Sequence, residues 1–272
     1  MLIAADRNRA LIFDARPVRP APRAAGMIAP RPQDTTTRTD MNPTETFNPS
    51  YLPRISVLIS GNGSNLQALI DGCAAGQIPA RIVQVISNRA DAHGLTRARQ
   101  AGIVSAFIDH RLFADRAAFD AALAEKIQEV SPDFVALAGF MRILTPAFVQ
   151  QFLGKLINIH PSLLPKYPGL NTHARALEAA DTLHGATVHF VTPTVDAGPA
   201  IVQGILNIQP GETLDHLKSR VHALEHRIYP QALAWLVTGA VRYADGQTTW
   251  QDPALARNRP QIIREEMPLA LK

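Results

Sequence analysis

Short apolar segments typical of buried strands alternate with segments typical of amphipathic helices through residues 54–160. The strand candidates are runs of β-branched and other apolar residues, at 54–60, 81–87, 104–108, 133–139 and 155–159. Between them, apolar residues at helical spacing predict helices at 66–73, 94–101 and 116–129, and a short helix from Pro146. This alternation predicts an α/β fold with a doubly wound, mostly parallel sheet and right-handed crossovers.

The pattern changes in the second half of the chain. Segments 186–191 and 200–206 indicate two strands joined by a turn-rich loop. A long helix over about 214–236 follows, and then two short strands near Val241 and Thr249. We therefore expect an antiparallel C-terminal extension of the sheet within one domain over 54–250, followed by a C-terminal tail over 251–272.

Residues 1–53 form a Pro-rich segment with scattered arginines, which we expect to be a disordered extension. An organelle transit peptide is the alternative, but Asp6 and Asp14 count against it.

Composition excludes several classes of protein. The chain is 46% hydrophobic and 18% charged with a net charge of +4, and no basic stripe indicates a nucleic-acid partner. Cys73 is the only cysteine, which excludes an intramolecular disulfide and is typical of a reducing compartment. No apolar run reaches the roughly 18 residues of a membrane span. We therefore expect a cytoplasmic protein with no membrane partner, in which Cys73 is buried apolar filler.

A polar pair lies at the end of the fifth strand candidate. Asn158 and His160 are two residues apart, so both side chains project from one face of an extended strand. Pro161, Pro165 and Pro168 then favour a fixed loop. Carboxyl ends of strands are where open α/β sheets bind ligands, which makes the pair a candidate site. The alternative is that both side chains only satisfy local backbone groups.

A glycine-rich turn at 61–65 joins the first strand candidate to the first helix, with Ser64 or Asn65 as the expected N-cap. Free N–H groups at such a helix start bind phosphate. No Gly-Lys-Ser/Thr follows, and Leu66 stands where a dinucleotide fingerprint needs its third glycine. A monophosphate is the ligand that remains, with a plain tight turn as the alternative.

Asp196 lies in the turn between the two later strands, where an aspartate usually serves its own backbone. If that loop folds over the fifth strand, Asp196 would pair with His160 and favour its charged form. An Asn, a His and an Asp without a nucleophilic Ser or Cys indicate acid–base and electrostatic catalysis of a transfer. The histidines form no metal-ligand motif, so we expect no metal.

Four motifs together resemble the phosphoribosylglycinamide formyltransferase family, folate-dependent enzymes of purine synthesis, over roughly residues 55–246. They are Ser-Gly-Asn-Gly-Ser-Asn-Leu-Gln at 60–67, Ala-Gly-Phe-Met-Arg-Ile-Leu at 138–144, Asn-Ile-His-Pro-Ser-Leu-Leu-Pro at 158–165 and Asp-Ala-Gly-Pro at 196–199. The second and third are shared more loosely with methionyl-tRNA formyltransferase and formyltetrahydrofolate deformylase. The first motif separates the families, since it resembles a site for the substrate phosphate.

The resemblance implies a Rossmann-like formyltransferase fold, a monomer or homodimer, and small-molecule substrates with 10-formyltetrahydrofolate as co-substrate. It implies three groups of site residues: a catalytic trio of Asn158, His160 and Asp196; a substrate site of Gly63, Ser64, Asn65 and Glu225; and a folate pocket of Arg116, Met141, Arg142, Ile143, Leu144, Asn158, Thr192 and Val195. Formyl hydrolysis by a deformylase and a non-catalytic folate- or nucleotide-binding module are the alternatives. A deformylase would carry an N-terminal regulatory domain, which 53 Pro-rich residues cannot supply.

Overall fold

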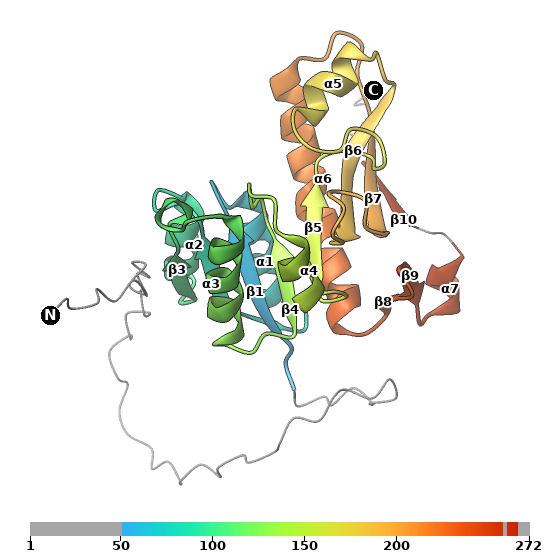
Figure 1. The fold of residues 1–272 in the computed structure, drawn as a ribbon. Helices are drawn as coiled ribbons and strands as arrows, with labels where there is room; N and C mark the ends of the chain where they lie inside the picture. Colours follow the sequence, from blue (N-terminus) through green and yellow to red (C-terminus); the bar gives the residue numbers. More distant parts are fainter. Residues whose placement is uncertain (1–50, 258–259, 266–272) are drawn as a thin grey trace, which may run out of the picture.

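The computed structural model describes residues 51–257 and 260–265 (Figure 1). The predicted disordered extension therefore lies, up to residue 50, outside the described residues. No helix in the described ranges is long and apolar enough to cross a membrane.

An eight-stranded sheet organises the described part of the chain, with the strand order β10-β7-β6-β5-β4-β1-β2-β3. Its strands are β1 (Arg54–Ile59), β2 (Arg81–Ser87), β3 (Val104–Phe107), β4 (Phe134–Leu137), β5 (Leu156–His160), β6 (Leu183–Phe190), β7 (Ala200–Asn207) and β10 (Gln261–Arg264). Of these strands, only β6 pairs antiparallel with its neighbours, β5 and β7. The predicted mostly parallel sheet with an antiparallel extension is confirmed.

Helices connect the strands, and a small hairpin follows the last long helix. The helices are α1 (Ser64–Ala74), α2 (His93–Gln100), the 3-10 turn η1 (His110–Leu112), α3 (Arg116–Gln128), α4 (Pro146–Gln151), α5 (Thr172–Glu178), α6 (Leu214–Val237) and α7 (Pro253–Ala256), and the hairpin strands are β8 (Val241–Ala244) and β9 (Gln247–Trp250). The two predicted short strands near Val241 and Thr249 thus pair with each other in a separate antiparallel sheet.

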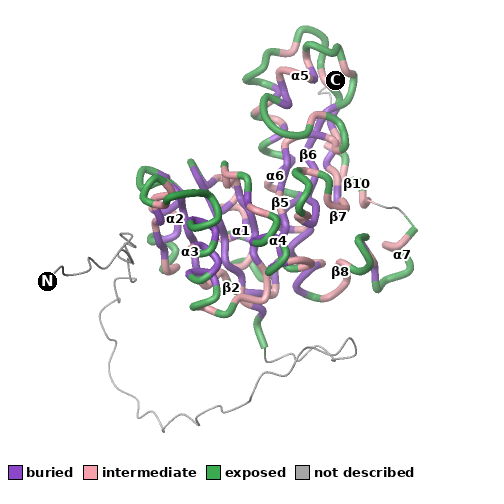
Figure 2. Tube along the Cα trace, viewed as in Figure 1, coloured by how far each residue is buried: buried purple, intermediate pink, exposed green. Residues whose placement is uncertain are grey.

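Apolar clusters cover both faces of the sheet, which explains why its central strands have continuous apolar sequences. In β1, Val57 and Ile59 belong to the cluster packed under α1, α2 and α6, whereas Leu58 belongs to the cluster under α3 and α4. Figure 2 shows these central strands as largely buried. Cys73 packs against the first cluster and is partly buried, where the prediction had it buried; this burial raises the pKa of its thiol to about 11.

The switch point of the sheet lies between β1 and β4. The chain leaves β1 towards β2 and β3 on one side and then crosses to β4 on the other. Since β1, β4 and β5 run parallel, the loops that follow them lie at one edge of the sheet. This edge of an open α/β sheet is where ligands bind.

The N-cap of α1 differs from the prediction. Gly63 takes this position instead of Ser64 or Asn65, with a left-handed φ of 76°. A Cβ at Gly63 would lie 2.6 Å from the Cα of Gly94, so only glycine fits between the two backbones. Ser64 and Asn65 consequently form the first turn of the helix.

The segment predicted to be a C-terminal tail contains α7 and β10, which the sequence analysis did not anticipate. β10 pairs in parallel with β7 and becomes the edge strand of the sheet. Glu265, just after β10, forms an ion pair with Arg220 of α6. The Arg220 guanidinium also binds both oxygens of Glu212 at 2.8 and 2.9 Å, and the Glu212 side chain is 0% exposed. Arg220 therefore ties the long helix to the last strand.

We expect Arg220→Met to destabilise the fold by about 2 kcal/mol, because it removes a charged hydrogen-bond donor from the Glu212 carboxylate, which then keeps only the Gln209 N–H and the His216 ring. Glu265→Gln serves as the matched control, since Glu265 is partly exposed and Arg220 keeps Glu212. Urea denaturation of both variants measures the difference. Equal losses of unfolding free energy would show that Glu212 does not depend on Arg220.

Candidate active site

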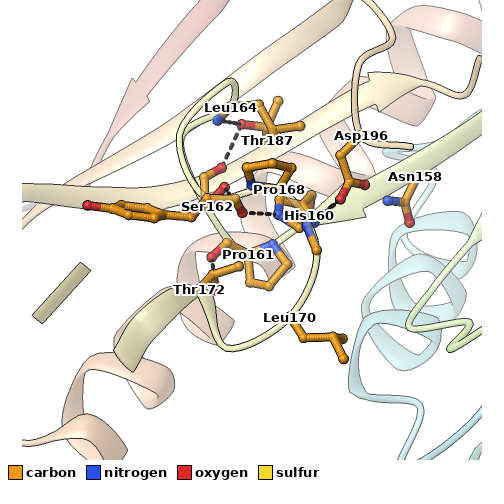
Figure 3. Close-up of polar contacts among 12 residues, drawn as sticks. Asn158, His160, Pro161, Ser162, Leu164, Pro168, Leu170, Thr172, Thr187 and Asp196 are labelled. Atoms are coloured by element: carbon orange, nitrogen blue, oxygen red, sulfur yellow. Dashed lines mark hydrogen bonds and ion pairs between the residues drawn. The ribbon is translucent and has the colours of Figure 1, made fainter. Parts of the chain in front are cut away.

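His160 ends β5, and a Pro-rich loop follows it. Hydroxyl groups fix this loop against its neighbours: Ser162 Oγ donates to the Lys166 carbonyl at 2.6 Å, and Thr187 Oγ1 of β6 donates to the Ser162 carbonyl at 2.7 Å. Thr172 Oγ1 donates to the Pro161 carbonyl at 2.6 Å. The loop after β5 is therefore held from α5 and β6, as Figure 3 shows.

The His160 imidazole lies between two oxygen acceptors. Its Nε2 is 2.9 Å from the Tyr167 carbonyl, which turns back because Tyr167 has a left-handed φ of 56°. Its Nδ1 is 3.5 Å from Asp196 Oδ2, and the imidazole is 7% exposed. Only the protonated ring has an N–H at both nitrogens, so this surrounding suits an imidazolium.

Asp196 reaches His160 from the loop between β6 and β7, so the predicted pairing of these two residues is present (Figure 3). Asp196 Oδ2 also accepts the Gly169 N–H at 2.8 Å, which ties this loop to the Pro-rich loop. A Cβ at Gly198 would lie 1.8 Å from the Phe190 carbonyl oxygen, so glycine is required for the loop to fold back there. The carboxylate is thereby fixed beside the imidazole.

His189 is a site residue that the sequence analysis missed. It faces Asn158 across the β5–β6 pair, with Asn158 Nδ2 3.2 Å from His189 Nε2. His189 Nδ1 lies 2.9 Å from the Phe190 carbonyl, and burial lowers the pKa of this imidazole, which favours its neutral form. The Nδ1 proton then bonds the carbonyl, and Nε2 accepts an N–H of Asn158.

The orientation of the Asn158 amide follows from this contact. A primary amide has two N–H bonds, and His189 accepts one of them. The nitrogen end is thereby fixed beside Asp196, whose Oδ1 is 3.9 Å from His189 Nε2. The only sequence signal for His189 is its place in the strand that turned out to pair with β5.

The start of α1 and the middle of α6 meet at a second polar cluster. Asn65 Nδ2 donates to Glu225 Oε2 at 2.8 Å, so two residues of the predicted substrate site are in contact. Glu225 is 4% exposed; burial raises the pKa of its carboxyl, and the bond from Asn65 opposes that shift. Ser64 lies next to this pair in the first turn of α1.

Arg97 of α2 supplies a cation at the same place and was also missed. Its Nε donates to the Asn62 carbonyl and its Nη2 to Asn62 Oδ1, both at 2.9 Å. A groove of about 490 Å³ beside it is lined by Ser64, Arg97 and His226, among others. The His226 Nε2 in this groove is buried and has no hydrogen-bond partner within the described ranges. Nothing in the sequence distinguishes Arg97 from the other arginines.

Half of the predicted folate-pocket residues lie on the loop after β4. Met141 and Ile143 are 70% and 55% exposed, whereas Leu144 is buried. The Arg142 guanidinium lies 5.0 Å from the centroid of the Phe119 ring on α3. Exposed apolar side chains beside a polar site are typical of ligand pockets.

Three further predicted pocket residues lie on other elements. Val195 is 49% exposed and immediately precedes Asp196, and Thr192 Oγ1 lies 3.4 Å from the Thr194 carbonyl in the same loop. Arg116 is exposed in the first turn of α3. The residues of 51–257 and 260–265 contain no group of three His, Cys, Asp or Glu side chains that could hold a metal.

These features define an α/β protein with an Asn, a His and an Asp at the carboxyl end of β5, on the edge of the sheet that also carries an apolar loop after β4 and a helix-start loop after β1. Residues 53–233 match the family described as Formyl transferase, and the chain belongs to this family.

Within that family, the chain is similar to proteins named phosphoribosylglycinamide formyltransferase. It is 50% identical to the Escherichia coli protein of that name over 198 residues, which cover 73% of this chain and 93% of the relative. It is 48% identical over 198 residues to the human trifunctional purine biosynthetic protein adenosine-3, of which the match covers 20%.

Solved structures agree in fold. The Coxiella burnetii phosphoribosylglycinamide formyltransferase, determined in complex with CHES, matches with a TM-score of 0.71 and 51% identity over 74% of this chain and 94% of that one. Glycinamide ribonucleotide transformylase 1 from Symbiobacterium toebii matches with a TM-score of 0.72 and 46% identity over 74% and 95%.

A buried histidine pair joins α5 to β6, the two elements that hold the Pro-rich loop. His173 of α5 and His184 of β6 are 8% and 1% exposed, and His173 Nδ1 lies 3.0 Å from His184 Nε2. One ring must donate and the other accept, so the contact requires that the pair is not doubly protonated. Burial lowers the pKa of both imidazoles to about 4.

We expect this pair to make the fold acid-sensitive. The unfolded chain takes up protons at these histidines near pH 6.5, whereas the folded chain does so only near pH 4, so stability falls as pH drops between these values. His184→Gln should reduce the loss of melting temperature across this window relative to the unaltered chain. If the melting temperatures of the two proteins depended on pH in the same way, the histidine pair would not be the source of the acid sensitivity.

Proposed function

We propose that this chain transfers the formyl group of 10-formyltetrahydrofolate to the amine of phosphoribosylglycinamide. The observation that carries the proposal is the placement of His160, paired with Asp196 and two residues from Asn158, at the sheet edge that also carries the loops at 61–65 and 138–145. Similarity to phosphoribosylglycinamide formyltransferases over nearly their whole length supports it.

The chemistry matches the polar groups of the site. The substrate amine attacks the formyl carbon, a new C–N bond forms, and negative charge develops on the formyl oxygen. The bond from the formyl carbon to the folate nitrogen then breaks, and the proton lost by the amine ends on that nitrogen. An N–H of Asn158 would stabilise the oxygen. The Nδ1–H of protonated His160, which Asp196 holds only loosely at 3.5 Å, would turn to the same oxygen, and His160 would move the proton through this nitrogen, directly or through a water.

Asp196 would act on this step through His160. The Nδ1–Oδ2 separation of 3.5 Å exceeds that of a charge-assisted hydrogen bond, so the carboxylate would act mainly by its charge. His189 would keep the Asn158 amide turned with its nitrogen towards the site. No covalent enzyme intermediate is needed.

The substrate phosphate would bind at the start of α1. The N–H groups of Gly63, Ser64 and Asn65 lie at the positive end of the helix dipole, and Arg97 adds a cation. Glu225, linked to Asn65, would accept hydrogen bonds from the ribose hydroxyl groups.

The folate would bind along the loop after β4. Met141, Ile143 and Leu144 would contact its ring system, and Thr192 and Val195 would close the pocket from the loop that carries Asp196. Arg116 and Arg142 would face its glutamate tail, whose carboxylates suit guanidinium groups. The monomer or homodimer state, the cytoplasmic location and independence from metal stay predictions.

Formyl hydrolysis is the second candidate from the same chemistry, with water in place of the amine. It needs the trio but has no use for a phosphate site. The contact of Asn65 with Glu225, and Arg97 beside Asn62, favour transfer because they build a site for a second substrate.

We expect Ser64→Asp to weaken binding of the ribosyl substrate by roughly tenfold or more, because like charges repel at short range. An aspartate in the first turn also favours the helix, so the melting temperature should not fall. Calorimetric titration with each substrate measures the effect, and folate affinity should stay near that of the unaltered chain. Equal losses of affinity for both ligands would show that the substrate phosphate does not bind at the start of α1.

We expect His160→Ala and Asn158→Ala each to lower kcat on the order of a hundredfold or more, with smaller effects on both binding constants, because their hydrogen bonds strengthen as charge develops. Asp196→Asn should lower kcat as well, because it removes the negative charge beside the imidazole. Steady-state kinetics of each variant measures these effects.

A double variant tests whether the trio acts as one unit. His160→Ala with Asp196→Asn should be little worse than His160→Ala alone, since Asp196 acts through the imidazole. Asp181→Asn is the matched control: Asp181 holds Lys166 and Tyr167 of the same loop but does not pair with His160, so any loss of kcat that it causes should multiply with that of His160→Ala. Losses that multiply in the double variant would contradict the trio.

A further inference from the structure

Ser60 joins three loops at the switch point of the sheet. It directly follows β1 and is 4% exposed. Its hydroxyl donates to Asn88 Oδ1 at 2.5 Å and accepts the Met141 N–H at 2.8 Å. Its backbone N–H donates to the Gly139 carbonyl at 3.0 Å. One small side chain thus contacts the loops after β2 and β4 while its own backbone begins the loop after β1.

Of these three loops, those after β1 and β4 are the ones assigned above to the two substrates. The phosphate loop, residues 61–65, begins at the next residue. The folate loop, residues 138–145, is held at its start by Ser60 and at its end by Asp120, whose Oδ2 accepts the Thr145 N–H at 2.6 Å. Of these two anchors, Ser60 is the one that lies directly against the phosphate loop.

The Ser60 hydroxyl is buried, so its two hydrogen bonds are costly to lose. The hydroxyl uses its proton on Asn88 and a lone pair on the Met141 N–H, so its removal would leave the buried Asn88 acceptor and the partly buried Met141 donor without their partner. The loops would then shift to satisfy these groups elsewhere. Group transfer is sensitive to such shifts, since a displacement of about 1 Å can cost on the order of a hundredfold in rate.

We propose that Ser60 is a positioning residue that fixes the folate loop against the phosphate loop and so sets the separation of the amine from the formyl carbon. This inference rests on the proposed function, because it concerns the same two substrates. Ser60 itself lies beneath the loops and acts through Met141 and Asn88.

Ser56 offers a matched control on the same strand. It is fully buried, and its hydroxyl donates to the side chain of Gln84 in β2 at 3.3 Å, just as Ser60 donates to Asn88 after β2. Ser56 lies four residues earlier, away from the carboxyl edge. Ser56→Ala therefore reports the cost of losing a buried serine hydroxyl in β1, and Ser60→Ala adds the loss of the loop contact.

The test compares kcat and KM of Ser60→Ala with those of Ser56→Ala, with one substrate varied while the other is saturating. We expect Ser60→Ala to lower kcat by roughly tenfold to a hundredfold and to raise KM for the folate. KM for the ribosyl substrate should change little, because the N–H groups of the phosphate loop remain. Ser56→Ala should keep kcat within about twofold of the unaltered chain, and its melting temperature should be similar to that of Ser60→Ala. Ser60→Cys, which keeps the size but has only a weak S–H donor, should fall between the unaltered chain and Ser60→Ala.

The outcomes separate this inference from the proposed function. Equal kcat for Ser60→Ala and Ser56→Ala, or a loss in proportion to the unfolded fraction, would overturn the positioning role while leaving the transfer reaction intact. If Ser60→Ala fails to fold, Ser60→Cys with unaltered kcat and folate KM would overturn it. Failure of the unaltered chain to formylate the ribosyl substrate would overturn the proposed function and this inference with it.

Discussion

The position of His160 depends on the parallel pairing of β5 with β4, which brings the carboxyl end of β5 to the edge where the loop after β4 begins. From there the imidazole meets the Tyr167 carbonyl on one side and the Asp196 carboxylate on the other. The Pro-rich loop carries the first oxygen and the loop between β6 and β7 carries the second, and the Gly169 N–H joins the two loops. The rest of the site is arranged around this imidazole.

The antiparallel direction of β6 allows this strand and the loop after it to contribute His189 and Asp196 to the site. Because β6 runs antiparallel to β5, His189 lies directly opposite Asn158 and fixes its amide. The loop that leaves β6 starts beside the beginning of β5 and folds back, which brings Asp196 to His160. A purely parallel arrangement would need a long crossover at this point. The antiparallel extension therefore contributes side chains to the chemistry as well as stability to the sheet.

Much of the fold could be predicted from the sequence, because strands buried on both faces and amphipathic helices carry strong local patterns. Asn158 and His160 were recognisable since strand geometry fixes the relation between residues two apart. His189 and Arg97 were not, because their roles depend on strand pairing and helix docking between distant segments. β10 is four residues long and is held by β7 and by Arg220, contacts that leave no local pattern. The predicted N-cap of α1, Ser64 or Asn65, was wrong, because the close approach of Gly94 requires a glycine at position 63 and this outweighs the usual capping preference.

Isotope tracing tests the central claim, transfer of a formyl group between two bound substrates, most directly. The chain would be mixed with folate that carries a carbon-13 label in its formyl group and with phosphoribosylglycinamide, and the label followed by NMR. The account predicts that the label moves to the amide of the ribosyl product in step with the loss of formyl-folate. Label that accumulates as free formate, or that leaves the folate at the same rate without the ribosyl substrate, would contradict it.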